Sequence, residues 1–98
     1  MLILSQNLND KTLFLMMKGC LTKKEVYKID DYVIPFIKKE QVKELVCDCS
    51  GLKRVDYEGK YVLLKMKLVL RKQKGKLTLC DVKQSIKNEL MGYRMRIQ

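Results

Sequence analysis

The stretch Val55-Asp56-Tyr57-Glu58-Gly59 decides how this chain folds, because it joins an apolar segment to a basic helical one. The apolar segment, ELVCDCS (residues 44–50), has the length and composition of a core strand, and Gly51 is expected to end it. Hydrophobic residues then recur at helical spacing from about residue 58 to residue 74. We therefore predict that VDYEG is a loop at the carboxyl end of a strand, where α/β sheets bind ligands and partners.

The helix that follows has two apolar faces. At about 100° per residue, a broad core face comprises Val62, Leu63, Met66, Val69 and Leu70. A narrower stripe comprises Tyr61, Leu64 and Leu68, flanked by Lys60, Lys67 and Arg71 on one side and by Lys65 and Lys72 on the other. A helix of one small domain needs only one buried face, so the stripe predicts a protein-docking surface. The alternative is that another helix covers it.

The acidic residues of the stretch have two interpretations. Asp56 and Glu58 lie at a helix N-terminus, where negative charge is stabilising by ~0.3–1 kcal/mol. Asp56 then only caps the helix, and Gly59 only relieves the turn. In the other interpretation Asp56, Tyr57, Glu58 and Gly59 form a partner-binding loop.

The remaining elements alternate between strands and helices. Two strands are predicted at MLILS (residues 1–5) and TLFLMMKG (residues 12–19), and a later one at KLTLCDV (residues 76–82). A capping box at Thr22 and Glu25 predicts a helix start, and Pro35 should kink or split that helix. Gly75 is expected to cap the helix of residues 58–74, and Gly92 to end a short one over residues 83–91. The tail YRMRIQ is either an edge strand or a frayed end.

This order predicts an α/β domain over residues 1–98. Crossover connections favour parallel pairing among the later strands, in a mixed sheet of four or five strands with three to four helices.

Composition restricts the function. The chain has 98 residues, a formal net charge of +10, four cysteines and no histidine. The charge favours nucleic acid, an anionic membrane or an acidic protein as partner, or else serves only solubility. Mixed zinc sites need histidine, so we expect no metal and no cofactor, with small buried thiols as the role of the cysteines. A cluster of Cys47, Cys49 and Cys80 on neighbouring strands is the alternative.

The location is predicted from what the sequence lacks. Residues 1–8 have no secretory pattern, and no apolar run approaches the ~20 residues of a membrane span. Together with reduced cysteines, this predicts a cytoplasmic protein.

Three motifs resemble those of the STAS domain of bacterial anti-sigma factor antagonists. They are Gly19-Cys20-Leu21-Thr22, Asp48-Cys49-Ser50-Gly51 and Val55-Asp56-Tyr57-Glu58-Gly59, in the order and spacing of that family. The resemblance covers nearly the whole chain. It implies a STAS-like fold and a non-catalytic partner switch, in which a kinase-like anti-sigma factor phosphorylates the serine or threonine after the aspartate. Phosphate adds a charge of about −1.5 to −2 beside the acidic loop and expels the partner.

This chain departs from the family pattern at Tyr57, which occupies the phosphoacceptor position. The phenol oxygen lies farther out than a serine hydroxyl, so we interpret Tyr57 as an aromatic contact residue, a type enriched in binding hot spots. Tyrosine phosphorylation is the other interpretation. The predicted partner surface is the loop of residues 55–59 with Lys60, Tyr61, Leu64, Lys67, Leu68 and Arg71.

Two other functions remain open. A STAS subunit that braces the ATPase of an Mla-type lipid ABC transporter needs no phosphoacceptor. A small basic nucleic-acid-binding domain would explain the charge, although the chain has no RNA-binding or helix-turn-helix signature. No nucleophile is paired with a base, so we do not expect an enzyme. We expect a monomer or a weak dimer.

Overall fold

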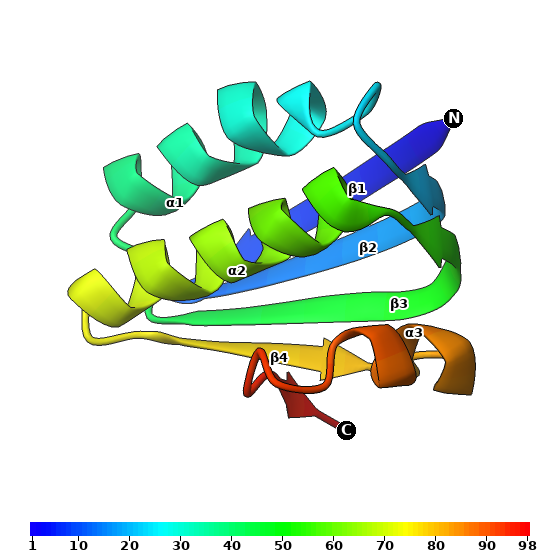
Figure 1. Ribbon diagram of the computed structural model, residues 1–98. Helices are drawn as coiled ribbons and strands as arrows, with labels where there is room; N and C mark the ends of the chain where they lie inside the picture. Colours follow the sequence, from blue (N-terminus) through cyan, green and yellow to red (C-terminus); the bar gives the residue numbers. More distant parts are fainter.

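Five strands form one mixed sheet in the order β1-β2-β3-β4-β5 (Figure 1). In this computed structural model, which describes residues 1–98, they are β1 (Leu2–Asn9), β2 (Thr12–Leu21), β3 (Glu44–Val55), β4 (Lys76–Cys80) and β5 (Arg96–Ile97). β1 is antiparallel to β2, and every later pair is parallel. The predicted α/β architecture is confirmed, and the tail supplies the fifth strand.

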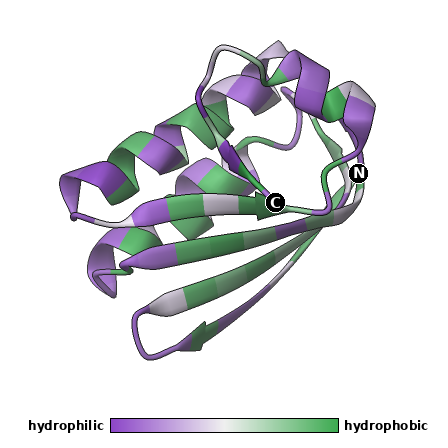
Figure 2. Cartoon of the chain, turned by 90° about the horizontal axis from the view of Figure 1, so that it is seen from below, coloured by the Kyte–Doolittle hydropathy of each residue, from purple (hydrophilic) through white to green (hydrophobic).

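The helices connect successive strands. They are η1 (Ile29–Val33, a π-helix), α1 (Ile34–Lys39), α2 (Tyr57–Lys72) and α3 (Gln84–Glu89). Helices α1 and α2 lie side by side over one face of the sheet (Figure 1). Figure 2 views the molecule from below, so that the strands are nearer to the reader and the opposite face of the sheet, which no helix covers, is visible.

Alternation along β2 separates the two faces of the sheet. Leu13, Leu15 and Met17 are buried beneath the helices, whereas Phe14 and Met16 lie on the open face and are 46% and 44% exposed. This period of two is the expected pattern for a sheet with one covered face. The core also receives Val62, Leu63, Met66 and Leu70, while Val69 packs at its margin, so the predicted core face of α2 is confirmed.

Pro35 divides the first helical region, as predicted. The Ile34 amide bonds to the Ile29 carbonyl in the wider π spacing, and α1 then begins with Pro35 in its first turn. Proline lacks an amide hydrogen, and the first turn of a helix is the place where none is needed.

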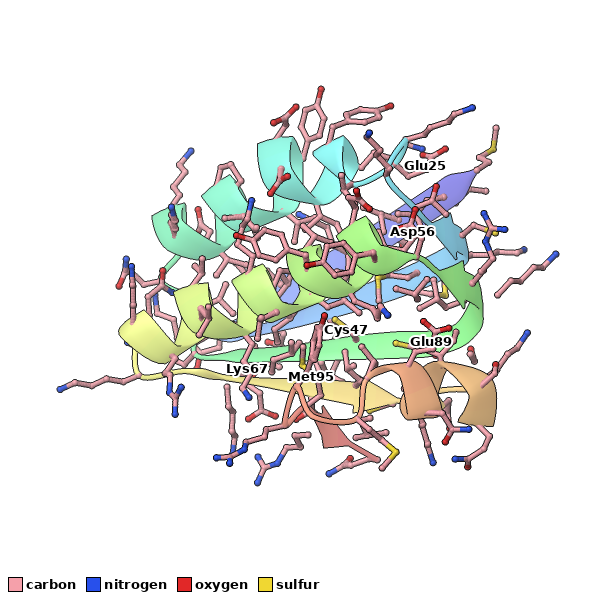
Figure 3. The ribbon with its side chains drawn as sticks, viewed as in Figure 1. Glu25, Cys47, Asp56, Lys67, Glu89 and Met95 are labelled. Carbon is pink, nitrogen blue, oxygen red and sulfur yellow. The ribbon has the colours of Figure 1, made fainter.

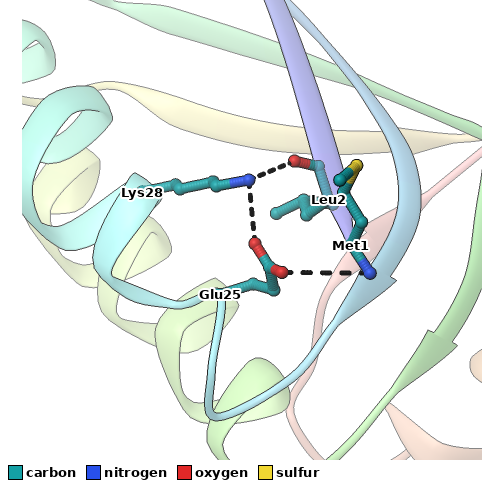
Figure 4. A network of polar contacts seen from close by, with 4 residues as sticks. All are labelled: Met1, Leu2, Glu25 and Lys28. Carbon is teal, nitrogen blue, oxygen red and sulfur yellow. Dashed lines mark hydrogen bonds and ion pairs between the residues drawn. The ribbon is translucent and has the colours of Figure 1, made fainter.

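The start of that region differs from the prediction. Only hydrogen-bonded turns follow Thr22, and the Glu25 carboxylate does not complete a capping box. It pairs instead with Lys28 at 2.8 Å and lies 3.8 Å from the Met1 amino group (Figure 4). The Lys28 ammonium also donates to the Leu2 carbonyl at 2.6 Å. A local cap is thus replaced by a contact to β1, which the short sequence motif does not reveal.

The predicted end of β3 at Gly51 is wrong. β3 continues to Val55, because it keeps pairing with β2 through two register shifts next to Lys18 and Cys20. Gly51 stands opposite Lys18, and a Cβ there would lie 3.2 Å from that side chain. This glycine therefore accommodates a neighbouring side chain in an irregular part of the ladder rather than a turn.

The end of α2 also differs from the prediction by one residue. Lys74, rather than the predicted cap residue Gly75, adopts the left-handed conformation that commonly ends a helix (φ 61°). The Lys74 amide donates to the Arg71 carbonyl and the Gly75 amide to the Leu70 carbonyl, which is the Schellman pattern. Glycine is needed at 75 for another reason, since a Cβ there would lie 2.7 Å from the Lys43 carbonyl.

The cysteines are free thiols, and Cys47 and Cys49 are buried on the covered face of the sheet. Burial raises the pKa of both thiols, that of Cys49 to about 12. We predict that a thiol reagent at pH 8 labels partly exposed Cys20 and Cys80 in the native protein and leaves Cys47 and Cys49 unlabelled until denaturant is added. Mass spectrometry of the labelled peptides checks this, and fast labelling of Cys47 would contradict the buried placement.

Candidate functional site

The first and third sequence motifs, residues 19–22 and 55–59, meet at one corner of the molecule, where β2 and β3 end and α2 begins, whereas the second motif, residues 48–51, lies within β3. Asp56 is the residue that joins the first and third motifs (Figure 3). Its amide donates to the Leu21 carbonyl at 3.2 Å, and its carboxylate accepts from the Gly59 amide and the Lys23 amide, both at 2.9 Å. Asp56 therefore caps α2 and also fastens the helix start to the segment after β2.

The predicted loop is much shorter than expected. Val55 is the last residue of β3, Asp56 is the N-cap, and Tyr57, Glu58 and Gly59 form the first turn of α2. The partner-binding loop of residues 55–59 is thus a strand end and a helix start joined by one residue. Such a connection holds its side chains more rigidly than a mobile loop does.

Gly59 lets the helix start approach β2 closely. A Cβ on Gly59 would lie 2.2 Å from the Leu21 carbonyl oxygen and 2.9 Å from a Val55 methyl group. Both distances are below those of real Cβ contacts, and the first of these atoms belongs to the backbone. Only glycine fits without displacing α2 from the end of β2.

Asp56 is held in its ionised form. Burial opposes ionisation, but hydrogen bonds from the Gly59 and Lys23 amides, aided by the charge of Arg54, outweigh it and keep the pKa of Asp56 below its ordinary value. A carboxyl whose pKa is lower in the folded state stabilises the fold above the unfolded-state pKa, and this contribution disappears as pH falls through the folded-state pKa.

We predict that Asp56→Ala lowers the free energy of unfolding at pH 7 by about 1 kcal/mol, the usual effect of losing an N-cap. The difference from the wild type should shrink as pH falls below ~3.9, the ordinary value for aspartate. Urea denaturation at pH 7 and pH 3 measures both quantities. A deficit of equal size at the two pH values would contradict an ionised cap.

The outer face of α2, defined as Tyr57, Tyr61, Leu64 and Leu68, points away from the sheet. Tyr57, Tyr61 and Leu68 are 70%, 56% and 44% exposed, and Leu64 is half-buried. No helix covers this face, so the alternative of a packed stripe is excluded for these three residues. Tyr57 lies in line with the stripe, because eleven residues, the spacing from Tyr57 to Leu68, make about three turns.

The cations beside the outer face contact neighbouring elements. Lys60 pairs with Glu89 of α3 at 3.2 Å, and Lys67 donates to the carbonyls of Tyr93 and Arg94 at 3.0 and 2.8 Å. Arg71 is exposed and makes no ion pair. Of the predicted partner-binding cations, Arg71 alone thus makes no intramolecular ion pair or side-chain hydrogen bond.

Lys65, on the other flank, pairs with Asp30 of η1 at 2.8 Å and lies 5.6 Å from the centre of the Tyr61 ring. The Asp30 hydrogen bond raises the pKa of Lys65. Sequence reasoning missed Asp30, Lys23 and the Leu21 carbonyl, which position the site from 33 to 38 residues away, and no local signal marks them.

The STAS domain family model matches residues 5–93. The chain belongs to the STAS domain family. Solved structures agree with this fold at low sequence identity. The unphosphorylated anti-sigma factor antagonist SpoIIAA is 15% identical with a TM-score of 0.82, and the match covers 100% of this chain and 87% of that chain. No curated protein matches this STAS domain by sequence.

Two further structures place the fold in different settings. A variant of RsbS from Moorella thermoacetica is 18% identical with a TM-score of 0.81, covering 97% of this chain and 85% of that chain. The murine anion transporter Solute Carrier 26 family member A9 is 17% identical with a TM-score of 0.72, covering 86% of this chain but 14% of that one. In the present STAS domain no helix is long and apolar enough to cross a membrane.

Proposed function

We propose that this STAS domain is a partner-binding regulatory protein that acts like an anti-sigma factor antagonist and contacts its partner through the outer face of α2. The exposure of Tyr57 carries the proposal, since a 70% exposed aromatic ring stands on the first turn of a helix fastened by Asp56 and Gly59. The similar folds of the anti-sigma factor antagonist SpoIIAA and of RsbS support the proposal.

Tyr57 takes the place of the phosphoacceptor serine in the resemblance, and its ring is the working group in this proposal. An exposed tyrosine buries a large rigid ring against a partner while its hydroxyl stays at the wet rim of the interface. Tyr61, Leu64 and Leu68 extend the apolar centre of that interface along the helix. Glu58 and Arg71 lie at its two ends and supply part of a polar rim.

The partner is a kinase-like anti-sigma factor in this proposal, bound by a non-catalytic cytoplasmic protein without a cofactor. The ATPase subunit of an ABC-type lipid transporter is the second candidate, favoured by the tyrosine itself, because a permanent subunit needs no phosphoacceptor. We further propose that residues 1–98 form a single domain and that the protein is a monomer or a weak dimer.

Affinity purification of the tagged protein at native expression level tests it. We expect a kinase-like anti-sigma factor to be retained by the wild type and lost from Tyr57→Ala. Phe14→Ala is the matched control, because it removes an exposed aromatic ring from the open face of the sheet. An ABC ATPase with the same dependence on Tyr57 would replace the first candidate by the second.

The charge gives an independent check. If cations of α2 steer an acidic protein partner, added salt should lower the association rate far more than it raises the dissociation rate. Stopped-flow binding at several salt concentrations measures both rates. Tight binding to mixed-sequence RNA with a steep logarithmic salt dependence would support the nucleic-acid-binding alternative and contradict the proposal.

A further inference from the structure

Three of the four arginines of the chain gather around one hollow. Lysine is the usual cation of this sequence, with 17 of the 21 basic residues, so a local concentration of arginine is unexpected. The hollow has a volume of about 190 Å³ and lies between the second half of α2, the start of β4 and the C-terminal segment. Its lining residues are Lys67, Arg71, Gly75, Lys76, Leu77, Arg94 and Arg96.

The C-terminal segment is held so that its two arginines face outward. Tyr93, Met95 and Ile97 pack against the core, and the alternate residues Arg94 and Arg96 are exposed. The Lys67 ammonium bonds to two successive carbonyls of this segment, and Figure 3 shows Lys67 close to Met95. The arginines are therefore presented by a segment fixed to both the core and α2, rather than by a free tail.

Acidic side chains do not neutralise the basic residues that line the hollow. Among the five lining cations only Lys76 has a carboxylate partner, Glu44 at 4.0 Å, and both of these side chains are largely exposed. No arginine of the chain forms an ion pair. Arg71 also lies in the last turn of α2, where a cation complements the helix dipole, but that reason does not apply to Arg94 or Arg96.

We propose that this hollow, the arginine pocket, binds a small compound that carries two linked phosphate groups. Guanidinium groups form paired hydrogen bonds to phosphate oxygens, a geometry that ammonium groups do not offer. Five positive charges from two sides of the hollow exceed the charge of one phosphate and match that of a diphosphate better. The volume is below the ~300–1,000 Å³ typical of drug-sized ligands, which favours a group of this size over a larger molecule.

The arginine pocket is separate from the Tyr57 end of the proposed partner surface. Asp56 and Lys67 are labelled at different ends of α2 in Figure 3. The pocket shares Lys67 and Arg71 with the predicted partner surface, but its other lining residues lie outside that surface, so binding of a diphosphate can be tested on the protein alone.

Isothermal titration of the full chain with inorganic diphosphate near physiological salt tests the proposal. We expect saturable binding with one site and weaker binding of sulfate at equal ionic strength. The double variant Arg94→Gln and Arg96→Gln should bind at least about tenfold more weakly, since it removes two paired contacts. The double variant Arg94→Lys and Arg96→Lys keeps the charge and should recover only part of the affinity.

The matched control is the double variant Lys53→Gln and Arg54→Gln. It removes the same charge and contains the one arginine outside the pocket, on an exposed part of β3. We expect its affinity for diphosphate to change less than about twofold. An equal loss in both glutamine variants, or no saturable binding, would overturn the proposal in favour of a diffuse basic surface.

A second ligand tests whether a hydrocarbon attached to the diphosphate contributes to binding. Geranyl diphosphate carries the same group on an apolar chain, and Leu77 is the single apolar side chain in the lining. We therefore expect it to bind with nearly the affinity of inorganic diphosphate. Binding of geranyl diphosphate alone would assign the affinity to the hydrocarbon and contradict a phosphate site.

Discussion

Replacing Gly59 by alanine is expected to lower the free energy of unfolding by about 3 kcal/mol, the largest stability effect that we predict. The added methyl group would lie 2.2 Å from the Leu21 carbonyl oxygen, which is backbone and cannot rotate away. Alanine is the better helix former by ~1 kcal/mol, so the loss measured is the steric cost less this gain. The melting temperature of a domain of this size should fall by roughly 15 °C.

Gly51→Ala is the matched control for this variant. Its methyl group would meet the flexible Lys18 side chain at 3.2 Å, and its backbone is that of an ordinary strand residue. We expect a change below ~1 kcal/mol in urea denaturation followed by circular dichroism. If Gly59→Ala were as stable as Gly51→Ala, α2 would not begin against the end of β2, and the rigid placement of Tyr57 would lose its basis.

Tyr57→Ala is expected to weaken partner binding by more than tenfold while leaving the fold intact. Truncation of an aromatic hot-spot residue costs ~2 kcal/mol or more of binding free energy. The ring is 70% exposed in the free protein, so its removal exposes no core and should leave the thermal melt nearly unchanged. Titration of the variant against the co-purified partner gives the affinity.

Two further substitutions at this position separate the ring from the hydroxyl. Tyr57→Phe keeps the ring and should bind within about twofold of the wild type. Tyr57→Ser supplies the hydroxyl that the family resemblance places there, yet it should bind as weakly as the alanine variant because it lacks the ring. If phenylalanine were as damaging as alanine, the hydroxyl would be the working group, and tyrosine phosphorylation would replace the ring-contact interpretation.

Much of the fold follows from local patterns in the sequence. The alternation in β2, the spacing of Val62, Leu63, Met66 and Leu70, and the position of Pro35 each reflect a periodicity or a backbone restriction carried by a few neighbouring residues. The order of elements then leaves few topologies, because parallel strands need right-handed crossovers.

Glycines were harder to interpret from sequence, since a glycine serves either a turn or a close contact. The sequence predicts Gly51 as the end of a strand and Gly75 as a helix cap, but each lies opposite atoms from a distant part of the chain, Lys18 and Lys43. The capping box at Thr22 is absent partly for a similar reason, because Glu25 faces the amino terminus as well as its near neighbour Lys28. Contacts between distant segments decide these details, and a local pattern does not contain them.

The sequence predicts which residues of the candidate site are exposed better than it predicts their contacts with other elements. Tyr61 and Leu68 are exposed along one line of α2, as the helical spacing indicates, and Tyr57 extends this line because α2 begins one residue earlier than predicted. The contacts of Lys60 with Glu89 and of Lys67 with the C-terminal segment were not predictable, because they depend on how the last 15 residues return to α2. These contacts engage two of the predicted cations, and those of Lys67 also help to form the arginine pocket.

Site-specific photo-crosslinking tests the central claim, that the partner binds the outer face of α2. A photoreactive phenylalanine analogue is placed at Tyr57 in one variant and at Phe14 in another, so that the same probe reports from α2 and from the open face of the sheet. We predict that irradiation of the complex joins the partner to position 57 and leaves position 14 unlinked. A cross-link at position 14 with none at position 57 would contradict the proposed interface.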